Sequence, residues 1–185
     1  YIYCGNDYRK SDFLGWMKMK RDTNVNLNNP RVYIEGGIIA SVYVVLALVF
    51  APISFGPIQL RIAEALTALP LRRGSAVSGL FVGCFIANSL GPNGMMDAVI
   101  GSVLTLIAAV ITYYLREKNF FVAMLAPVVI NAVGIGLMIK YIYADTLNLH
   151  LIMAYIAGGQ ILACMGLGYL FIRAYDKADE RILKY

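Results

Sequence analysis

The sequence predicts an all-α integral membrane protein, a compact bundle of six transmembrane helices with both termini in the cytoplasm. Hydrophobic residues make up 59% of the chain, charged residues only 15%, and the mean hydropathy is +0.66, which excludes an ordinary soluble domain. Apolar stretches close to membrane-spanning length alternate with short polar turns. The cationic residues gather in alternate connections, a pattern typical of a multi-pass membrane protein.

Polar segments flank the predicted membrane domain, which covers residues 32–175. Residues 1–31 lack the apolar core of a signal peptide, and we expect a disordered or non-native tail there. Met17 and Met19 precede a basic stretch, which favours a natural start in that region. Residues 176–185 alternate in charge and are expected to form a cytoplasmic tail.

Three apolar segments are expected in the first half of this domain. The first covers residues 32–55 and ends before the Gly56-Pro57 turn, since proline is well tolerated where the next helix begins. The second, residues 58–71, is short and polar for a membrane span, so neighbouring helices are expected to shield it. A basic turn then leads to the third segment, residues 75–90.

The second half continues with spans over residues 95–115, 120–143 and 148–175. Alternating crossings place both tails, the Arg72 turn and the Arg116 loop on one side of the membrane. The connections on the other side contain no Lys or Arg, so the positive-inside rule puts both termini in the cytoplasm.

Two cations, Arg61 and Lys140, depart from this pattern because they lie in or at the outer ends of apolar segments. A charge inside the bilayer costs at least about 2.5 kcal/mol, so such residues usually serve a function. With the topology above, a set of polar residues converges on the outer half of the bundle, where it suits a small polar ligand. The candidate ligand-binding residues are Arg61, Glu64, Asn88, Asp97, Asn131, Lys140, Asp145 and Gln160.

Structural roles are the alternatives for several of these residues. Arg61 and Glu64 are three residues apart and would pair with each other on one helical face. Asn131 and Gln160 are suited to hydrogen bonds between helices, and Asp97 to stabilising a helix N-terminus.

The first span also carries pairs of small residues spaced four apart, which allow a second helix to approach closely. These residues either pack inside this bundle or form a docking strip for a separate membrane subunit. The candidate docking residues are Gly36, Ala40, Ala47 and Ala51.

Several classes of protein are disfavoured by the motifs. The chain lacks HExxH, GxSxG and GxxxxGK[ST] motifs, so neither an enzyme nor an ATPase is expected. His150 is the one histidine, and the cysteines have no metal-ligand spacing, so no metal or cofactor is expected. The basic residues flank apolar spans rather than forming a patch with exposed aromatics, which argues against nucleic acid binding.

Three stretches resemble the QueT family: FGPIQLRIAEALTALP at residues 55–70, GLFVGCFIAN at 79–88 and DAVIGS at 97–102. The resemblance covers the chain from about residue 33 to its end. It implies a six-helix S component of an energy-coupling factor (ECF) transporter in a bacterial cell membrane. S components bind a vitamin-like solute near the outer surface, join a module of two ATPases and a transmembrane coupling protein, and topple to release the solute inward.

The implied ligand is a queuosine precursor, in particular preQ1 (7-aminomethyl-7-deazaguanine). Its N–H groups match a carboxylate, for which Glu64 is the first candidate and Asp97 and Asp145 are alternatives or partners of the ammonium group. The amides, Arg61 and Lys140 are candidate donors to its carbonyl. A standalone secondary transporter or channel is the alternative function, since six helices could form two repeats of three.

Overall fold

The computed structural model describes residues 30–54, 60–92, 94–143 and 146–182, and the elements in these ranges are all helical. Most are α-helices, η1 and η2 are 3₁₀-helices, and η3 is a π-helical segment between α7 and α8. In chain order they are α2 (Pro30–Val49), α3 (Ala51–Ser54), η1 (Ile62–Leu71), α4 (Ser75–Ser89), α5 (Gly94–Tyr114), η2 (Leu115–Glu117), α6 (Phe120–Tyr141), α7 (Leu149–Gln160), η3 (Ile161–Leu167) and α8 (Gly168–Ile182).

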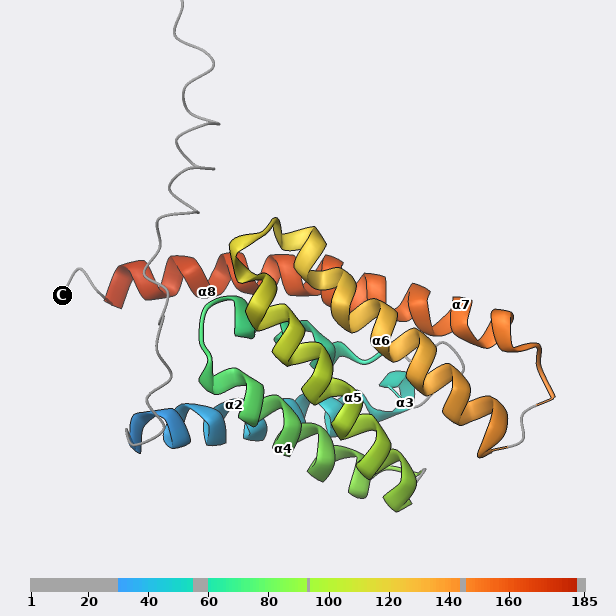
Figure 1. Cartoon of the computed structure of the whole chain (residues 1–185). Helices are drawn as coiled ribbons and strands as arrows, with labels where there is room; N and C mark the ends of the chain where they lie inside the picture. The colour runs from blue at the N-terminus through green and yellow to red at the C-terminus, as the bar shows by residue number, and fades with distance from the viewer. Residues whose placement is uncertain (1–29, 55–59, 93, 144–145, 183–185) are drawn as a thin grey trace, which may run out of the picture.

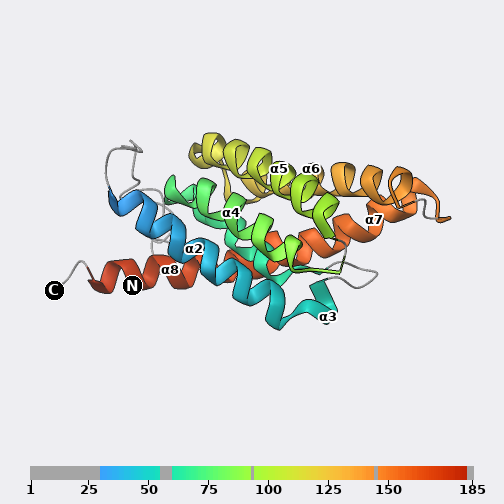
Figure 2. The ribbon, with the colours of Figure 1, turned by 90° about the horizontal axis from the view of Figure 1, so that it is seen from below.

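The long helices form a bundle around η1 (Figures 1 and 2). The 3₁₀-helix η1 contacts α2, α4, α5, α6, η3 and α8, and every residue from Ala63 to Leu71 is buried. The expectation that neighbouring helices shield this short segment is therefore confirmed. Because η1 is surrounded, its polar side chains face other helices rather than lipid.

Four stretches of the described chain are long and apolar enough to cross a membrane: Pro30–Val49, Gly94–Glu117, Phe120–Tyr141 and Leu149–Asp179. The other two apolar segments, η1 and α4, are shorter. A ten-residue 3₁₀-helix rises about 20 Å and a 15-residue α-helix about 22 Å, less than the roughly 30 Å of a bilayer core. The described chain thus has the six predicted apolar segments, of which four have full spanning length.

Small residues bring α2 and α4 into close contact. A Cβ atom built on Gly79 would lie 2.6 Å from the carbonyl oxygen of Gly36, and one on Gly83 would lie 3.0 Å from the Cα of Ala40. Gly36, Ala40 and Ala47 are all buried on this side of α2. These three candidate docking residues therefore pack inside the bundle, and the fourth, Ala51, is half-buried in α3.

Charged residues join three elements at one end of the bundle. The guanidinium of Arg72, after η1, donates two hydrogen bonds of 2.8 Å to Asp176 of α8. Arg73 lies 3.3 Å from Asp179 of α8 and 3.8 Å from Glu35 of α2. The beginning of α2, the Arg72 turn and the end of α8 thus meet at one end of the bundle.

The segment expected to form the cytoplasmic tail is helical as far as Ile182. Helix α8 runs through residue 176 and continues to Ile182, and Asp176 is 5% exposed. The buried carboxylate is tolerated because Arg72 binds both of its oxygens. The helical bundle therefore extends beyond the expected boundary at residue 175.

Candidate ligand-binding site

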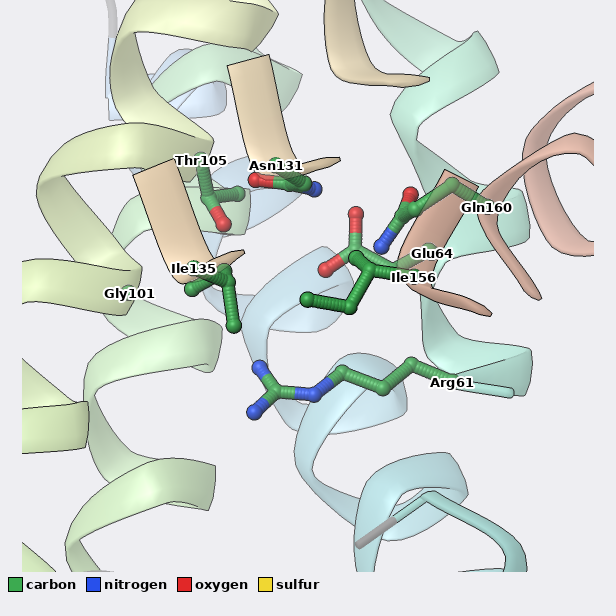
Figure 3. A pocket seen from close by; sticks show the side chains of 8 residues that line it. All are labelled: Arg61, Glu64, Gly101, Thr105, Asn131, Ile135, Ile156 and Gln160. Atoms are coloured by element: carbon green, nitrogen blue, oxygen red, sulfur yellow. The ribbon is translucent and has the colours of Figure 1, made fainter. Parts of the chain in front are cut away.

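A cavity lies between η1, α5, α6 and α7 (Figure 3). It encloses about 240 Å³ of space not filled by atoms, including the part that opens to solvent. The side chains leave only a small part of this space open to a molecule, so a ligand the size of a nucleobase would require the lining residues to move apart. Its lining residues are Arg61, Glu64, Gly101, Thr105, Asn131, Ile135, Ile156 and Gln160.

Glu64 brings a carboxylate to the centre of the bundle because it lies in the first turn of the buried helix η1. It is 1% exposed, and the hydroxyl of Tyr43 donates a 2.7 Å hydrogen bond to its Oε1. Its Oε2 has no hydrogen-bond partner among the described residues, although the Asn131 amide lies near the carboxylate. A buried acceptor without a partner is costly, so this oxygen is suited to a donor on a ligand.

Arg61 precedes η1 in an extended conformation, with φ −83° and ψ 99°. Its Nη2 donates to Oδ2 of Asp97, in the first turn of α5, at 3.1 Å. Both residues are buried. The alternative of a local Arg61–Glu64 pair assumed one continuous α-helix. The extended backbone at Arg61 instead allows the guanidinium to reach α5.

Gln160 is the last residue of α7, and η3 follows it directly. The thiol of Cys164 donates to Oε1 of Gln160 at 3.1 Å, and both residues are buried. Figure 3 shows the amide nitrogen of Gln160 turned toward the Glu64 side of the cavity. The cavity thus brings together a carboxylate, a guanidinium and two amides from elements far apart in the sequence.

Among the described residues, Asn88, Asp97 and Lys140 were also predicted for the site but lie outside the cavity lining. Asn88 donates from Nδ2 to the backbone carbonyl of Asp97 at 3.1 Å, which supports the start of α5. Lys140 donates to the carbonyl of Leu147 at 2.8 Å, near the end of α6. Asp145 lies outside the described residues.

Several residues of the site were not predicted. Gly101 and Thr105 follow Asp97 at four-residue intervals, Ile135 follows Asn131 by four, and Ile156 precedes Gln160 by four. Following each predicted polar residue by one or two helical turns along its own face would have identified them. The hydrogen bond from Tyr43 had no such signal, because it links residues 21 positions apart.

The chemistry of the cavity is that of a binding site. Carboxylate oxygens accept hydrogen bonds, and the guanidinium and amide N–H groups donate them, around apolar walls formed by Ile135 and Ile156. Among the residues that the structure describes, no group of three or more His, Cys, Asp or Glu side chains is arranged to hold a metal ion.

The comparison with protein families agrees with this architecture. The model of the family described as QueT transporter matches residues 33–177, which cover most or all of each of the six apolar helical segments and the whole lining of the cavity. No curated protein and no solved structure matches the chain. The family match and the apolar helices together identify a membrane transport protein. The chain therefore belongs to the QueT transporter family.

Proposed function

We propose that this chain is the substrate-binding S component of an ECF-type ATP-dependent importer in a bacterial cell membrane, and that it captures a queuosine precursor, preQ1, from outside. The observation that carries the proposal is the Glu64 carboxylate, whose Oε2 is buried beside the cavity without a hydrogen-bond partner among the described residues. The 7-deazaguanine base of preQ1 offers N–H donors on one edge, which is the group that such an oxygen requires.

The charges around the cavity favour a cationic ligand. Glu64 and Asp97 are acids, Arg61 is a base, and in their usual ionisation states the three sum to one negative charge. An uncompensated charge is expensive inside an apolar bundle. The aminomethyl group of preQ1 is protonated at neutral pH, so its binding would neutralise this cluster.

The ATP-hydrolysing partners follow from the family resemblance. The sequence has no phosphate-binding loop, so an ECF module of two ATPases and a transmembrane coupling protein would supply the energy. Because Gly36, Ala40 and Ala47 are buried inside the bundle, a coupling protein would meet α2 on its other side, where Gly37 and Ser41 are exposed. Lipid would cover the remaining exposed apolar side chains.

Calorimetry of the purified protein against preQ1, preQ0, queuine and guanine tests the ligand. We expect binding of preQ1 in preference to the others. Glu64→Gln should weaken it about 10- to 100-fold, because a hydrogen bond to a charged group contributes about 1.5–3 kcal/mol. Glu35→Gln is the matched control, because it is the same substitution at a glutamate that lies near Arg73 and outside the cavity lining. Equal affinities for the Glu64 variant and the wild type would remove Glu64 from the site.

Reconstitution distinguishes the proposed importer from a standalone secondary transporter or channel. Uptake of preQ1 into liposomes should require ATP and the co-reconstituted ECF module, both the ATPases and the coupling protein. Uptake by this chain alone, driven only by an ion gradient, would establish the alternative.

A further inference from the structure

Cys164 does not line the cavity itself, but it contacts two residues that do, Gln160 and Glu64. Its thiol donates to Oε1 of Gln160 at 3.1 Å. The same sulfur lies 3.6 Å from the backbone carbonyl oxygen of Glu64. Cys164 is 0% exposed, so both contacts lie away from solvent.

A second side chain ties this thiol to η1. The hydroxyl of Thr67 lies 2.6 Å from the carbonyl oxygen of Glu64 and 3.5 Å from the sulfur of Cys164. Thr67 is also fully buried. The thiol therefore has a defined place between η1 and η3, because it packs where the two segments meet.

The local helix geometry puts Cys164 behind Gln160. Gln160 ends α7, and Cys164 lies four residues later in the π-helical segment η3, which is wider than an α-helix. Because the thiol occupies Oε1, the amide nitrogen of Gln160 remains for the cavity, on the side of Glu64 (Figure 3). An N–H donor and a carboxylate acceptor are thereby presented next to each other.

We infer that Cys164 is a positioning residue for ligand selection in this pocket, an inference that rests on the proposed function. By holding the amide of Gln160, it makes the pocket select a planar heterocycle whose carbonyl lies beside N–H groups, as on the lactam edge of a 6-oxopurine. The carbonyl accepts from Gln160, and the N–H groups donate to Glu64. A heterocycle with an amino group in place of that carbonyl is disfavoured.

Loss of the Cys164 thiol reduces the preference for a ligand carbonyl over an amino group, because the thiol holds the Gln160 amide in one orientation. Without the S–H donor, only the nearby Glu64 carboxylate among the described groups opposes rotation of the Gln160 amide by half a turn about its last bond. Its oxygen then faces the cavity, where it accepts from an amino group and repels a carbonyl. Loss of one neutral hydrogen bond between Gln160 and the ligand lowers the affinity about fivefold. Replacing that attraction by repulsion between the amide oxygen and the ligand carbonyl lowers it about tenfold.

The test compares two ligands on purified full-length protein in detergent by calorimetry. One is preQ1, and the other is its analogue with an amino group replacing the 6-carbonyl. We expect Cys164→Ala to reduce the preference for preQ1 about five- to tenfold, and Cys164→Ser, which keeps a donor, to stay within about twofold of the wild type. Cys84→Ala is the control, because Cys84 is equally buried but contacts Asn88 and Thr105 instead of Gln160.

The outcomes separate this inference from the proposed function. An unchanged preference in Cys164→Ala, or an equal loss in Cys164→Ser and Cys84→Ala, overturns the role of Cys164. If Cys164→Ala does not fold, Cys164→Val restores the volume without a donor, and an unchanged preference there overturns the role as well. A wild-type protein that binds neither compound refutes the proposed function, and this inference falls with it.

Discussion

Replacing Asp97 by asparagine removes the negative charge next to Arg61 while nearly preserving the shape of the side chain. The closest nitrogen and oxygen of this ion pair are 3.1 Å apart, and the two side chains are only 9% and 1% exposed. At an effective dielectric constant of about 20, two unit charges at that distance attract by roughly 5 kcal/mol. Asparagine retains a neutral hydrogen bond, which returns about 1 kcal/mol.

The Glu64 carboxylate also interacts with Arg61 and continues to compensate part of its charge in the variant. We therefore expect a loss at the lower end of the range for broken buried pairs, about 3 kcal/mol in the free energy of unfolding. The measurement is unfolding of the purified protein in mixed micelles with increasing sodium dodecyl sulfate, followed by far-ultraviolet circular dichroism.

A double-mutant cycle isolates the pair from other effects of the substitution. Arg61→Met combined with Asp97→Asn should be more stable than the sum of the single losses indicates, by about 1–3 kcal/mol. Glu35→Gln, which neutralises an acid whose side chain is 42% exposed, should change stability by less than about 0.5 kcal/mol. If Asp97→Asn is as stable as the wild type and the cycle is additive, the pair does not stabilise the bundle and the reasoning is wrong.

Two further predictions concern packing and the charged end of the bundle. Gly79→Ala should destabilise the protein by about 1–3 kcal/mol because its Cβ would meet the Gly36 carbonyl at 2.6 Å, whereas Gly37→Ala, with nothing within 4 Å, should be neutral or stabilising in the same unfolding assay. Arg72→Lys should lower the thermal midpoint, since lysine cannot bind both oxygens of Asp176, and a midpoint equal to that of the wild type would show that the paired geometry is unimportant.

The sequence was informative about which residues would form the site. In a chain this apolar, a polar residue within a predicted span must be paired or functional, because burying it alone is costly. That reasoning selected Arg61, Glu64, Asn131 and Gln160, and the structure places all four around one cavity. Lys140 satisfied the same criterion but lies near the end of α6, where its ammonium group reaches the carbonyl of Leu147.

The partners of these residues were much less predictable. Arg61 pairs with Asp97, 36 positions away, and Glu64 accepts from Tyr43, 21 positions away. Local spacing favoured Arg61 with Glu64, but that argument required an α-helix, and the backbone at Arg61 is extended. The burial of Asp176 was missed for a similar reason, because its compensating charge, Arg72, belongs to a different element.

Composition, periodicity and the distribution of charge were therefore sufficient to establish a helical membrane protein, its apolar segments and the polar residues within them. These properties depend on the cost of placing each residue in an apolar environment, which local sequence largely records. The three-dimensional arrangement decided which polar groups meet and which small residues pack inside the bundle. It also decided which buried polar atoms of the described residues are left without a hydrogen-bond partner. A buried charge is stabilised by atoms within a few ångströms, and in this bundle those atoms come from helices distant in the sequence.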